Sequence, residues 1–144
     1  MNDPHNLVRF LEAQTSSYDN AVEELRRGRK TGHWIWYIFP QIAGLGRSHM
    51  SRRYAIASLT EAQAYAAHPV LGARLRECIS IVMDLNESSA EKIFGHLDAM
   101  KFRSCLTLFA IACGDESAFQ EALNQFFDGQ RDARTLAALC VKPG

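Results

Sequence analysis

The chain lacks carboxylates over a long stretch of its first half. No Asp or Glu stands between Glu24 and Glu61, although the whole chain holds 16 Asp and Glu against 16 Lys and Arg. Seven cations fall in or beside this interval: Arg26, Arg27, Arg29, Lys30, Arg47, Arg52 and Arg53. Since the total charge is zero, it gives no reason to expect a nucleic acid or a membrane surface as partner. Its uneven distribution makes the interval the first place to search for a site.

Long apolar runs are also missing. No uninterrupted run reaches the roughly 18 residues that a membrane-spanning helix needs, and the N-terminus lacks a basic stretch followed by an apolar one. We therefore expect a soluble, cytoplasmic protein with no membrane partner. A length of 144 residues with 47% hydrophobic content suits one packed core. The sequence predicts a single domain over residues 1–144 and leaves the oligomeric state open.

Motifs for metals, cofactors and covalent catalysis are absent. The four cysteines form no Cys-x-x-Cys pair and stand in apolar stretches, which predicts buried, reduced thiols: Cys78, Cys105, Cys113 and Cys140. The five histidines show no metal-binding spacing, so we expect no metal. Without a phosphate loop, dinucleotide fingerprint or serine elbow, we expect no cofactor, and common hydrolases and dehydrogenases lose support.

Apolar residues at helical spacing occur along most of the chain. Leu71, Leu75, Ile79 and Val82 form one stripe, and residues 98–113 are apolar on most sides, which predicts a central buried helix. Thr60 and Gln63 match a capping box that opens a helix ending near His68. We expect an all-α domain of about seven or eight helices with no substantial sheet.

The aromatic run from His33 to Pro40 is ambiguous. Aromatic and β-branched residues favour a strand, and the run has strand length. A solitary strand would leave its backbone groups unpaired, because no second alternating segment is present to pair with it. Consistency with the rest of the chain therefore favours a buried helix.

This run and the segment after it carry most of the candidate site, and Asp98 and Lys101 form a second polar set. Aromatic rings interleave with cations there, a combination that suits an anionic, ring-containing ligand. If residues 48–52 are helical, their hydroxyls and guanidinium lie within one turn. The candidate ligand-binding residues are Trp36, Gln41, Arg47, Ser48, Ser51, Arg52 and Lys101. Two candidates for catalysis are His33, which can titrate near neutral pH, and Asp98.

Each candidate also has a purely structural interpretation. The aromatic residues can belong to the core while the arginines are solvated, and His33 can be a hydrogen-bonded structural residue. Ser48 and Asp98 can each cap a helix. Both interpretations stay open at the level of the sequence.

Several segments resemble a bacterial family, the domain of unknown function numbered eighteen-ten. The similarity covers nearly the whole chain and implies an all-helical domain, in which residues 33–39 are helical. Some members carry the label calpastatin, but that inhibitor is largely disordered and this composition supports a packed core. The matching segments are residues 10–14, 28–41, 44–48, 64–65, 68–72, 93–95 and 107–109, with Asp98 and Lys101.

A second likeness is to the NADAR families, in the order of an aromatic segment, a later turn and an Asp with a Lys. These families are associated with N-glycosidic bonds of ADP-ribose-like and riboflavin-pathway molecules. The likeness implies that Trp36 stacks on a base, that Arg47 or Arg52 holds phosphate, and that Asp98 stabilises an oxocarbenium-like transition state.

The sequence thus favours a domain that binds a nucleotide or ADP-ribose-type molecule, with or without N-glycosidase activity. Two alternatives involve no catalysis. One is a nucleic-acid-binding module, which the balanced total charge disfavours, and the other is a protein-interaction surface rich in Trp, Tyr and Arg.

Overall fold

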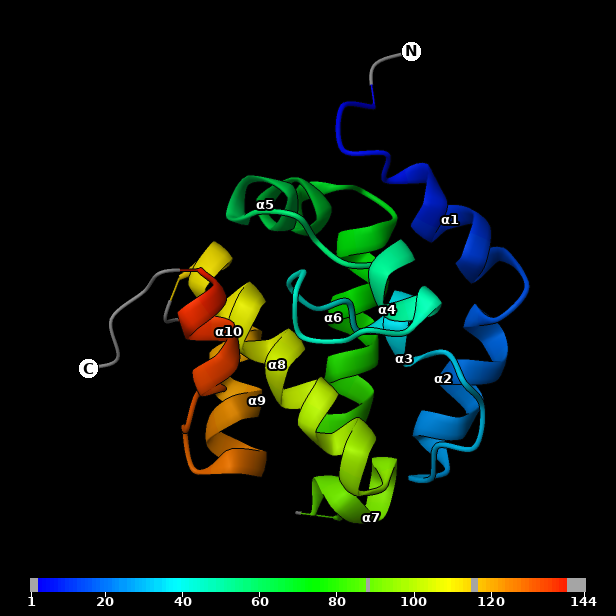
Figure 1. Cartoon of the computed structure of the whole chain (residues 1–144). Coiled ribbons are helices and arrows are strands. Elements are labelled where there is room, and N and C mark those ends of the chain that lie inside the picture. Colours follow the sequence, from blue (N-terminus) through cyan, green and yellow to red (C-terminus); the bar gives the residue numbers. More distant parts are fainter. Residues whose placement is uncertain (1–2, 88, 115–116, 140–144) are drawn as a thin grey trace.

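The computed structural model describes residues 3–87, 89–114 and 117–139. Within these ranges the chain forms ten helices and no strand (Figure 1). The helices are α1 Val8–Thr15, α2 Tyr18–Arg26, α3 Ile35–Ile38, α4 His49–Arg53, α5 Leu59–Ala67, α6 Leu71–Met83, α7 Ala90–Phe94, α8 His96–Cys113, α9 Ala118–Phe127 and α10 Ala133–Ala138. The all-α prediction is confirmed.

The expected number of seven or eight helices is too low. Helices α3, α4 and α7 hold only four or five residues each. Such short helices contain little more than one turn, so apolar periodicity cannot count them reliably. The described residues include one isolated parallel bridge, between Ile42 and Ile56.

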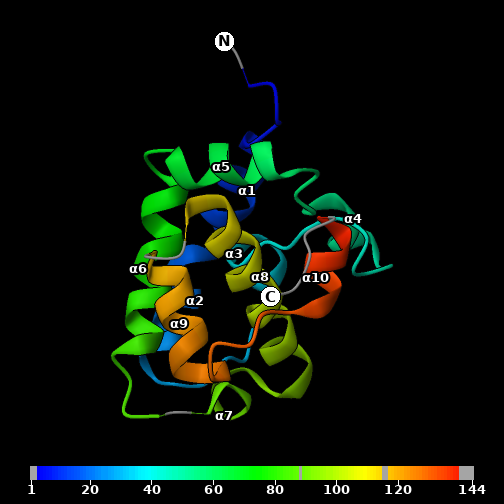
Figure 2. The ribbon, with the colours of Figure 1, turned by 90° about the vertical axis from the view of Figure 1, so that its left-hand side faces the viewer.

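Helix α8 lies at the centre of the molecule (Figures 1 and 2). It packs against α5, α7, α9, α10 and α3, and residues 104–110 are all buried. The predicted central helix is therefore confirmed, although it begins at His96 and not at Asp98. Asp98 does not cap the helix, because it lies inside the first turn.

Aromatic rings connect the segment after α3 to α7 and α8. Phe39 lies edge-on to Phe102, with ring centroids 4.9 Å apart, and Phe94 stacks on Phe102 at 4.6 Å. All three side chains are buried. Offset and edge-on ring pairs stabilise a core beyond the area that they bury. The cluster fixes the end of the aromatic run against α8.

The aromatic run is helical over four residues only. Trp34 precedes α3 and has a non-helical backbone, and Phe39 leaves the helix at the other end. Pro40 follows, and a proline disfavours helical geometry in the residue before it. The helix expected over residues 33–39 is thus shorter than predicted, and His33 lies outside it, exposed.

Two further predictions need correction. The N-cap of α5 is Ser58, whose hydroxyl accepts the Glu61 amide, and Thr60 lies within the helix. Ser58 and not Thr60 caps the helix, because the extended backbone of Ser58 directs its hydroxyl at the free amide of Glu61. Of the four cysteines, Cys78 and Cys105 are buried, as predicted, but Cys113 is exposed at the end of α8. Cys140 lies outside the described residues.

Candidate ligand-binding pocket

A pocket of about 150 Å³ opens between α3, α8, α10 and the loop after Pro40. Its surface is mostly apolar, and two of its rim residues are exposed hydrophobic side chains, Leu97 at 69% and Met100 at 49%. Charged groups border the same space. The lining includes Trp36, Gln41, Leu97, Met100, Lys101 and Arg134.

Lys101 covers one face of Trp36. Its Nζ lies 4.3 Å from the ring centroid, and it donates a hydrogen bond to Asp98 Oδ1 at 3.1 Å. Asp98 and Lys101 are one helical turn apart on α8, a spacing at which side chains meet. Trp36 is therefore held beneath a cation, and a ring that stacked on this face would have to displace Lys101.

Asp98 also binds Lys30, from the segment between α2 and α3. Lys30 Nζ lies 2.6 Å from Asp98 Oδ2 and 4.9 Å from the ring centroid of Trp34. Burial opposes ionisation of Asp98, but hydrogen bonds and the charges of Lys30 and Lys101 outweigh it and hold the Asp98 pKa below its usual value. Asp98 thus stays anionic and fixes both lysines.

Glu24 fixes the loop that leads to α3. One carboxylate oxygen, Oε1, accepts the amides of Thr31 and Gly32 at 2.6 and 2.7 Å and Trp34 Nε1 at 3.0 Å. Burial raises the pKa of this carboxyl, but the three hydrogen bonds lower it further, so the net pKa lies below the usual value. This contact was not predicted from the sequence, although Glu24 is the last carboxylate before the interval without acids.

Gln41 is buried on the pocket wall, with 8% of its surface exposed. Its backbone carbonyl accepts the Ile56 amide at 2.8 Å, part of the isolated bridge. Its side-chain Nε2 is buried and has no hydrogen-bond partner among the described residues. A buried donor without a partner costs about 1–3 kcal/mol. An acceptor brought into the pocket would recover part of this cost.

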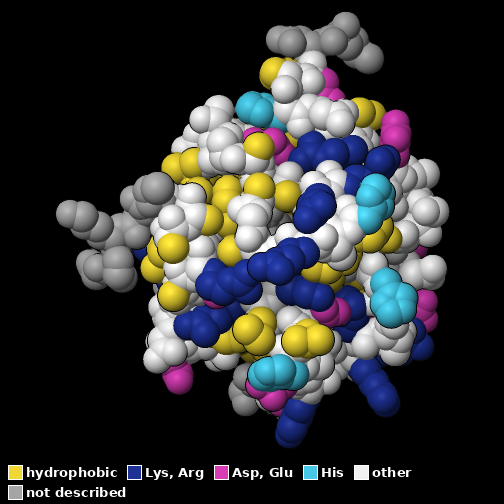
Figure 3. All heavy atoms as spheres, viewed as in Figure 1, with side chains coloured by type: hydrophobic (Ala, Val, Ile, Leu, Met, Phe, Trp, Pro, Cys, Tyr) yellow, Lys and Arg dark blue, Asp and Glu magenta, His cyan; other side chains and the backbone are white. Residues whose placement is uncertain are grey.

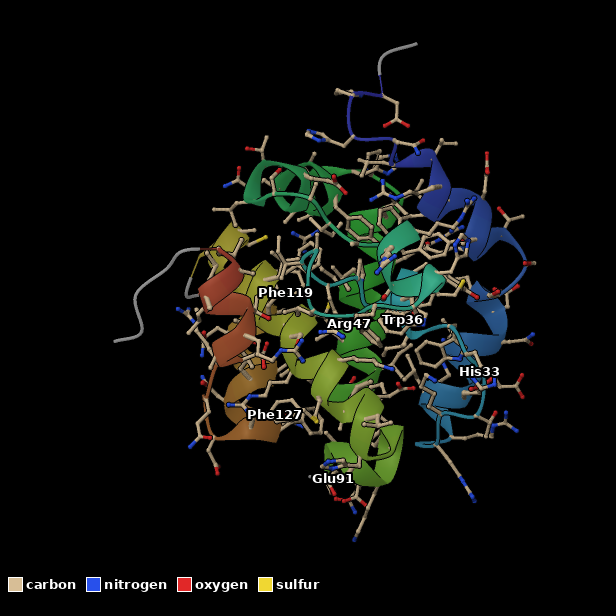
Figure 4. The ribbon with its side chains drawn as sticks, viewed as in Figure 1. His33, Trp36, Arg47, Glu91, Phe119 and Phe127 are labelled. Carbon is tan, nitrogen blue, oxygen red and sulfur yellow. The ribbon has the colours of Figure 1, made fainter. Side chains whose placement is uncertain are left out.

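The loop of residues 43–48 forms the lip of the pocket. Gly46 packs against Trp36, because a Cβ placed on it would lie 3.8 Å from the ring. Ser48 caps α4 by accepting the Ser51 amide, as one interpretation of the sequence predicted. Arg47 and Arg52 are exposed. Figure 4 labels Arg47 and Trp36 close together near the middle of the view.

The start of α10 supplies groups that the sequence analysis missed. Asp132 and Arg134 both line the pocket, and Arg134 Nη2 donates to the Leu45 carbonyl at 2.5 Å. Asp132 caps α10 by accepting the Thr135 amide. Asp is among the residues preferred at an N-cap, so the start of this helix has a local signal. Its proximity to Trp36, almost 100 residues earlier, has no local signal.

The structure brings together some of the predicted site residues and separates others. Trp36, Gln41 and Lys101 line one pocket. Ser51 lines a small neighbouring hollow that also contacts Trp36 and Gln41. Asp98 lies behind Lys101 and is not part of the lining, and neither is His33. Arg47, Ser48 and Arg52 belong to the adjacent loop and α4 but line neither hollow.

The face that carries these residues is basic. Figure 3 shows Lys and Arg side chains in a band across its middle, with hydrophobic side chains on both sides of the band and few carboxylates among them. A concentration of one charge raises the local concentration of ligands of the opposite charge.

The chain matches a family described as "Protein of unknown function (DUF1810)" over residues 4–139. The chain belongs to this family. The DUF1810 chain is also similar to the crystal structure of the conserved hypothetical protein Rv1873 from Mycobacterium tuberculosis. The two are 48% identical, with a TM-score of 0.93 over 97% of this chain and 100% of the other. No curated protein matches the DUF1810 chain.

The family description and the name of the solved structure state no function. The chemistry of this DUF1810 chain therefore has to be argued from its pocket. In the part of the chain that the structure describes, no three His, Cys, Asp or Glu side chains are arranged to hold a metal ion. No helix in that part is both long and apolar enough to cross a bilayer.

Proposed function

We propose that the DUF1810 chain binds a small anionic molecule with a flat ring, such as a nucleotide, in the pocket beside Trp36. The observation that carries the proposal is the Nε2 donor of Gln41, which is buried on a mostly apolar wall and lacks a partner among the described residues. Lys101 and Arg134 add two cations to the same lining. Apolar walls with a few converging polar groups are typical of small-molecule sites.

The volume of the pocket limits the part of a ligand that can enter it. An engineered cavity of about 150 Å³ holds one benzene molecule, and this pocket has a similar volume of about 150 Å³. One ring therefore fits inside, and the remainder of a nucleotide or ADP-ribose lies on the basic surface. Arg134 at the rim and Arg47 on the lip are suited to phosphate there.

Binding is better supported than N-glycosidic cleavage by Asp98. Both oxygens of its carboxylate are engaged, one by Lys30 and one by Lys101. Asp98 is thus a positioning residue for Lys101, and its charge is already balanced. An oxocarbenium-like transition state needs a carboxylate that faces the reacting sugar.

The two tryptophans provide an internal test of this proposal. Trp36 lines the pocket, whereas the Trp34 indole donates to Glu24 and is buried away from it. In an NMR titration with ADP-ribose, AMP, GMP and UMP, we expect saturable shifts of the Trp36 indole signal and a nearly constant Trp34 signal. If all four compounds leave the Trp36 signal unchanged, the proposal is wrong. Product analysis of the same samples separates binding from hydrolysis.

A matched pair of lysine variants checks the role of charge. Lys101→Gln removes a cation from the lining and should weaken binding at least about tenfold, equivalent to 1.4 kcal/mol. Lys92→Gln removes a cation whose side chain is 75% exposed on α7, outside the pocket, and should leave affinity unchanged. Equal affinities of the two variants would contradict a contact between Lys101 and the ligand.

The basic band favours a second candidate function, the binding of single-stranded nucleic acid. Such binding weakens steeply with salt, because each phosphate contact releases a counterion. Affinity for an oligonucleotide that exceeds the affinity for mononucleotides and falls steeply with salt would favour this candidate. A mononucleotide that binds as tightly as the oligonucleotide would favour the pocket.

A further inference from the structure

Asp132 lines the same pocket as Gln41. Asp132 Oδ2 accepts the Thr135 amide at 2.9 Å and Thr135 Oγ1 at 2.6 Å, and it lies 3.1 Å from Ser104 Oγ, whose one proton is shared with the Met100 carbonyl, also at 3.1 Å. All the hydrogen bonds that the Asp132 carboxylate accepts from described residues therefore go to one oxygen, Oδ2. No described residue donates to the other oxygen, Oδ1. The pocket lining thus combines a buried donor without a partner, Gln41 Nε2, with a carboxylate oxygen that accepts no hydrogen bond from the described residues, Asp132 Oδ1.

Hydrogen bonds hold the Asp132 carboxylate and the backbone of Gln41 in place. Asp132 is fixed from three sides by Ser104 of α8, by Thr135 of α10 and by its own amide, which donates to Thr107 Oγ1 at 2.9 Å. Gln41 is anchored through its backbone to Ile56. Fixed polar groups on an apolar wall select a ligand by the pattern of its own donors and acceptors, because a mismatch leaves buried groups unpaired.

We propose that the pocket recognises a six-membered heterocycle on which a carbonyl stands next to an N–H, as in uracil or the six-membered ring of guanine. The carbonyl accepts from Gln41 Nε2 and the N–H donates to Asp132 Oδ1. This inference rests on the proposed function and specifies its substrate class. Phosphate on the ligand stays outside, at Arg134, whose guanidinium donates one hydrogen bond to the Leu45 carbonyl and has further N–H groups available for phosphate.

The combination of Gln41 Nε2 and Asp132 Oδ1 argues against a simple aromatic acid that binds with its carboxylate inside the pocket. Such a group would meet the Asp132 carboxylate, and like charges that meet in a pocket repel each other. A ring with no N–H would leave Oδ1 unused. The presence of an acid in a lining that also holds Lys101 and Arg134 therefore points to a ligand that carries a donor on its ring and its charge elsewhere.

The test compares UMP with N3-methyl-UMP, which keeps the ring and phosphate and loses the N–H. Binding to the unaltered protein is followed by the Trp36 indole signal. We expect UMP to bind at least about tenfold more tightly, the cost of one lost hydrogen bond in such a site. Because both compounds meet the same folded protein, the comparison does not depend on the stability of a variant.

The variant Asp132→Asn provides a second test. The affinity for UMP should fall if Asp132 accepts the ring N–H, and rise if Asp132 only repels phosphate. Asn caps helices as well as Asp does, so α10 is retained, with the amide oxygen as cap and the NH₂ group toward the pocket. If Oδ1 accepts the ring N–H, the variant binds UMP at least about tenfold more weakly and no longer prefers it to N3-methyl-UMP. If Asp132 only repels phosphate, the loss of its charge tightens the binding of both compounds, which would overturn the inference.

The outcomes also separate this inference from the proposed function. Equal affinity of the unaltered protein for UMP and N3-methyl-UMP, with a saturable Trp36 shift for each, overturns the inference and leaves the proposed function intact. Absence of a Trp36 shift with UMP and with every other nucleotide tested overturns both.

Discussion

The ammonium of Lys101 lies over the ring of Trp36, 4.3 Å from its centroid, and Lys30 lies in the same way over Trp34 at 4.9 Å. Asp98 joins the two lysines with its two carboxylate oxygens. Two tryptophans from one aromatic run are thus held to α8 through two cations and a single carboxylate. The arrangement gives Trp34 and Trp36 opposite roles, one in the core and one on the pocket wall.

This relationship explains how a segment without carboxylates folds. One of its cations, Lys30, pairs with Asp98 on α8, and the amides of Thr31 and Gly32 donate to Glu24 near the end of α2. The first of these contacts bridges almost 70 residues of sequence. The contacts of these two acids therefore position the aromatic run beside the pocket.

Asp98→Asn should lower the free energy of unfolding at pH 7 by about 1–3 kcal/mol, less than the loss of a fully buried pair because Lys101 is partly in water. The Asp98 pKa is lowered in the folded state from its usual value of 3.8. Its contribution is therefore complete above about pH 3.8 and is lost as the pH falls through the lower, folded pKa. Urea unfolding between pH 7 and pH 2 should show this loss in the native protein and a flatter profile in the variant.

Glu91→Gln is the matched control for Asp98→Asn. Glu91 Oε1 lies 3.3 Å from His96 Nδ1, and the two side chains are 66% and 71% exposed. Such exposed pairs contribute roughly 0–1 kcal/mol. A loss of stability in Glu91→Gln as large as that in Asp98→Asn would show that the Lys30–Asp98–Lys101 contacts are not special.

Glu24→Leu should destabilise the protein by roughly 3 kcal/mol, because three donors around Oε1 lose a charged acceptor. Glu24→Gln keeps an amide oxygen there and should cost about 1 kcal/mol. In both variants the Trp34 indole signal should shift, since Trp34 Nε1 donates to this oxygen. Unchanged stability in Glu24→Leu would mean that the loop of residues 31–34 is held by other contacts. Thermal unfolding and the NMR signal measure the two effects separately.

The helices that the sequence predicted well are those with several turns. The stripe of Leu71, Leu75, Ile79 and Val82 is buried on α6, because a 13-residue helix repeats its apolar face often enough to be read. The secondary structure of the aromatic run from His33 to Pro40 was harder to predict. Its local propensity favours a strand, whereas the lack of a partner strand and the family resemblance both indicated a helix. The end of this run packs through Phe39 against Phe102.

The pocket was predicted only in part for a similar reason. Trp36 and Gln41 belong to an unusual segment, so composition alone drew attention to them. Asp132 and Arg134 come from an ordinary helix start and reach the pocket because α10 packs on α8. Long-range packing of this kind leaves no pattern in neighbouring residues. Whether any of these side chains contacts a ligand stays a prediction.

Gly46→Ala should close the lip of the pocket at a cost of about 1–3 kcal/mol, typical of overpacking. A Cβ at Gly46 would lie 2.7 Å from Cβ and Oγ of Ser51, which is buried and hydrogen-bonded to the Ser48 carbonyl. Ser51→Gly in the same chain removes both atoms and should restore part of the stability. Chemical unfolding of the single and double variants measures this. Equal stabilities of the two would assign the cost to something other than this contact.

Gln41→Met should change stability and binding in opposite directions. Met has a similar length and no polar group, so the variant removes a buried donor that lacks a partner and should leave the free energy of unfolding unchanged or raise it by about 1 kcal/mol. The same change removes the donor offered to the ligand, and the affinity for UMP should fall at least about tenfold. Gln63→Met is the control, since Gln63 is exposed on α5 and should affect neither quantity. Thermal unfolding measures the change in stability, and titration of the Trp36 signal measures the change in affinity for UMP. A Gln41→Met variant that is clearly less stable and binds UMP normally would show that the Gln41 amide serves the fold and not the pocket.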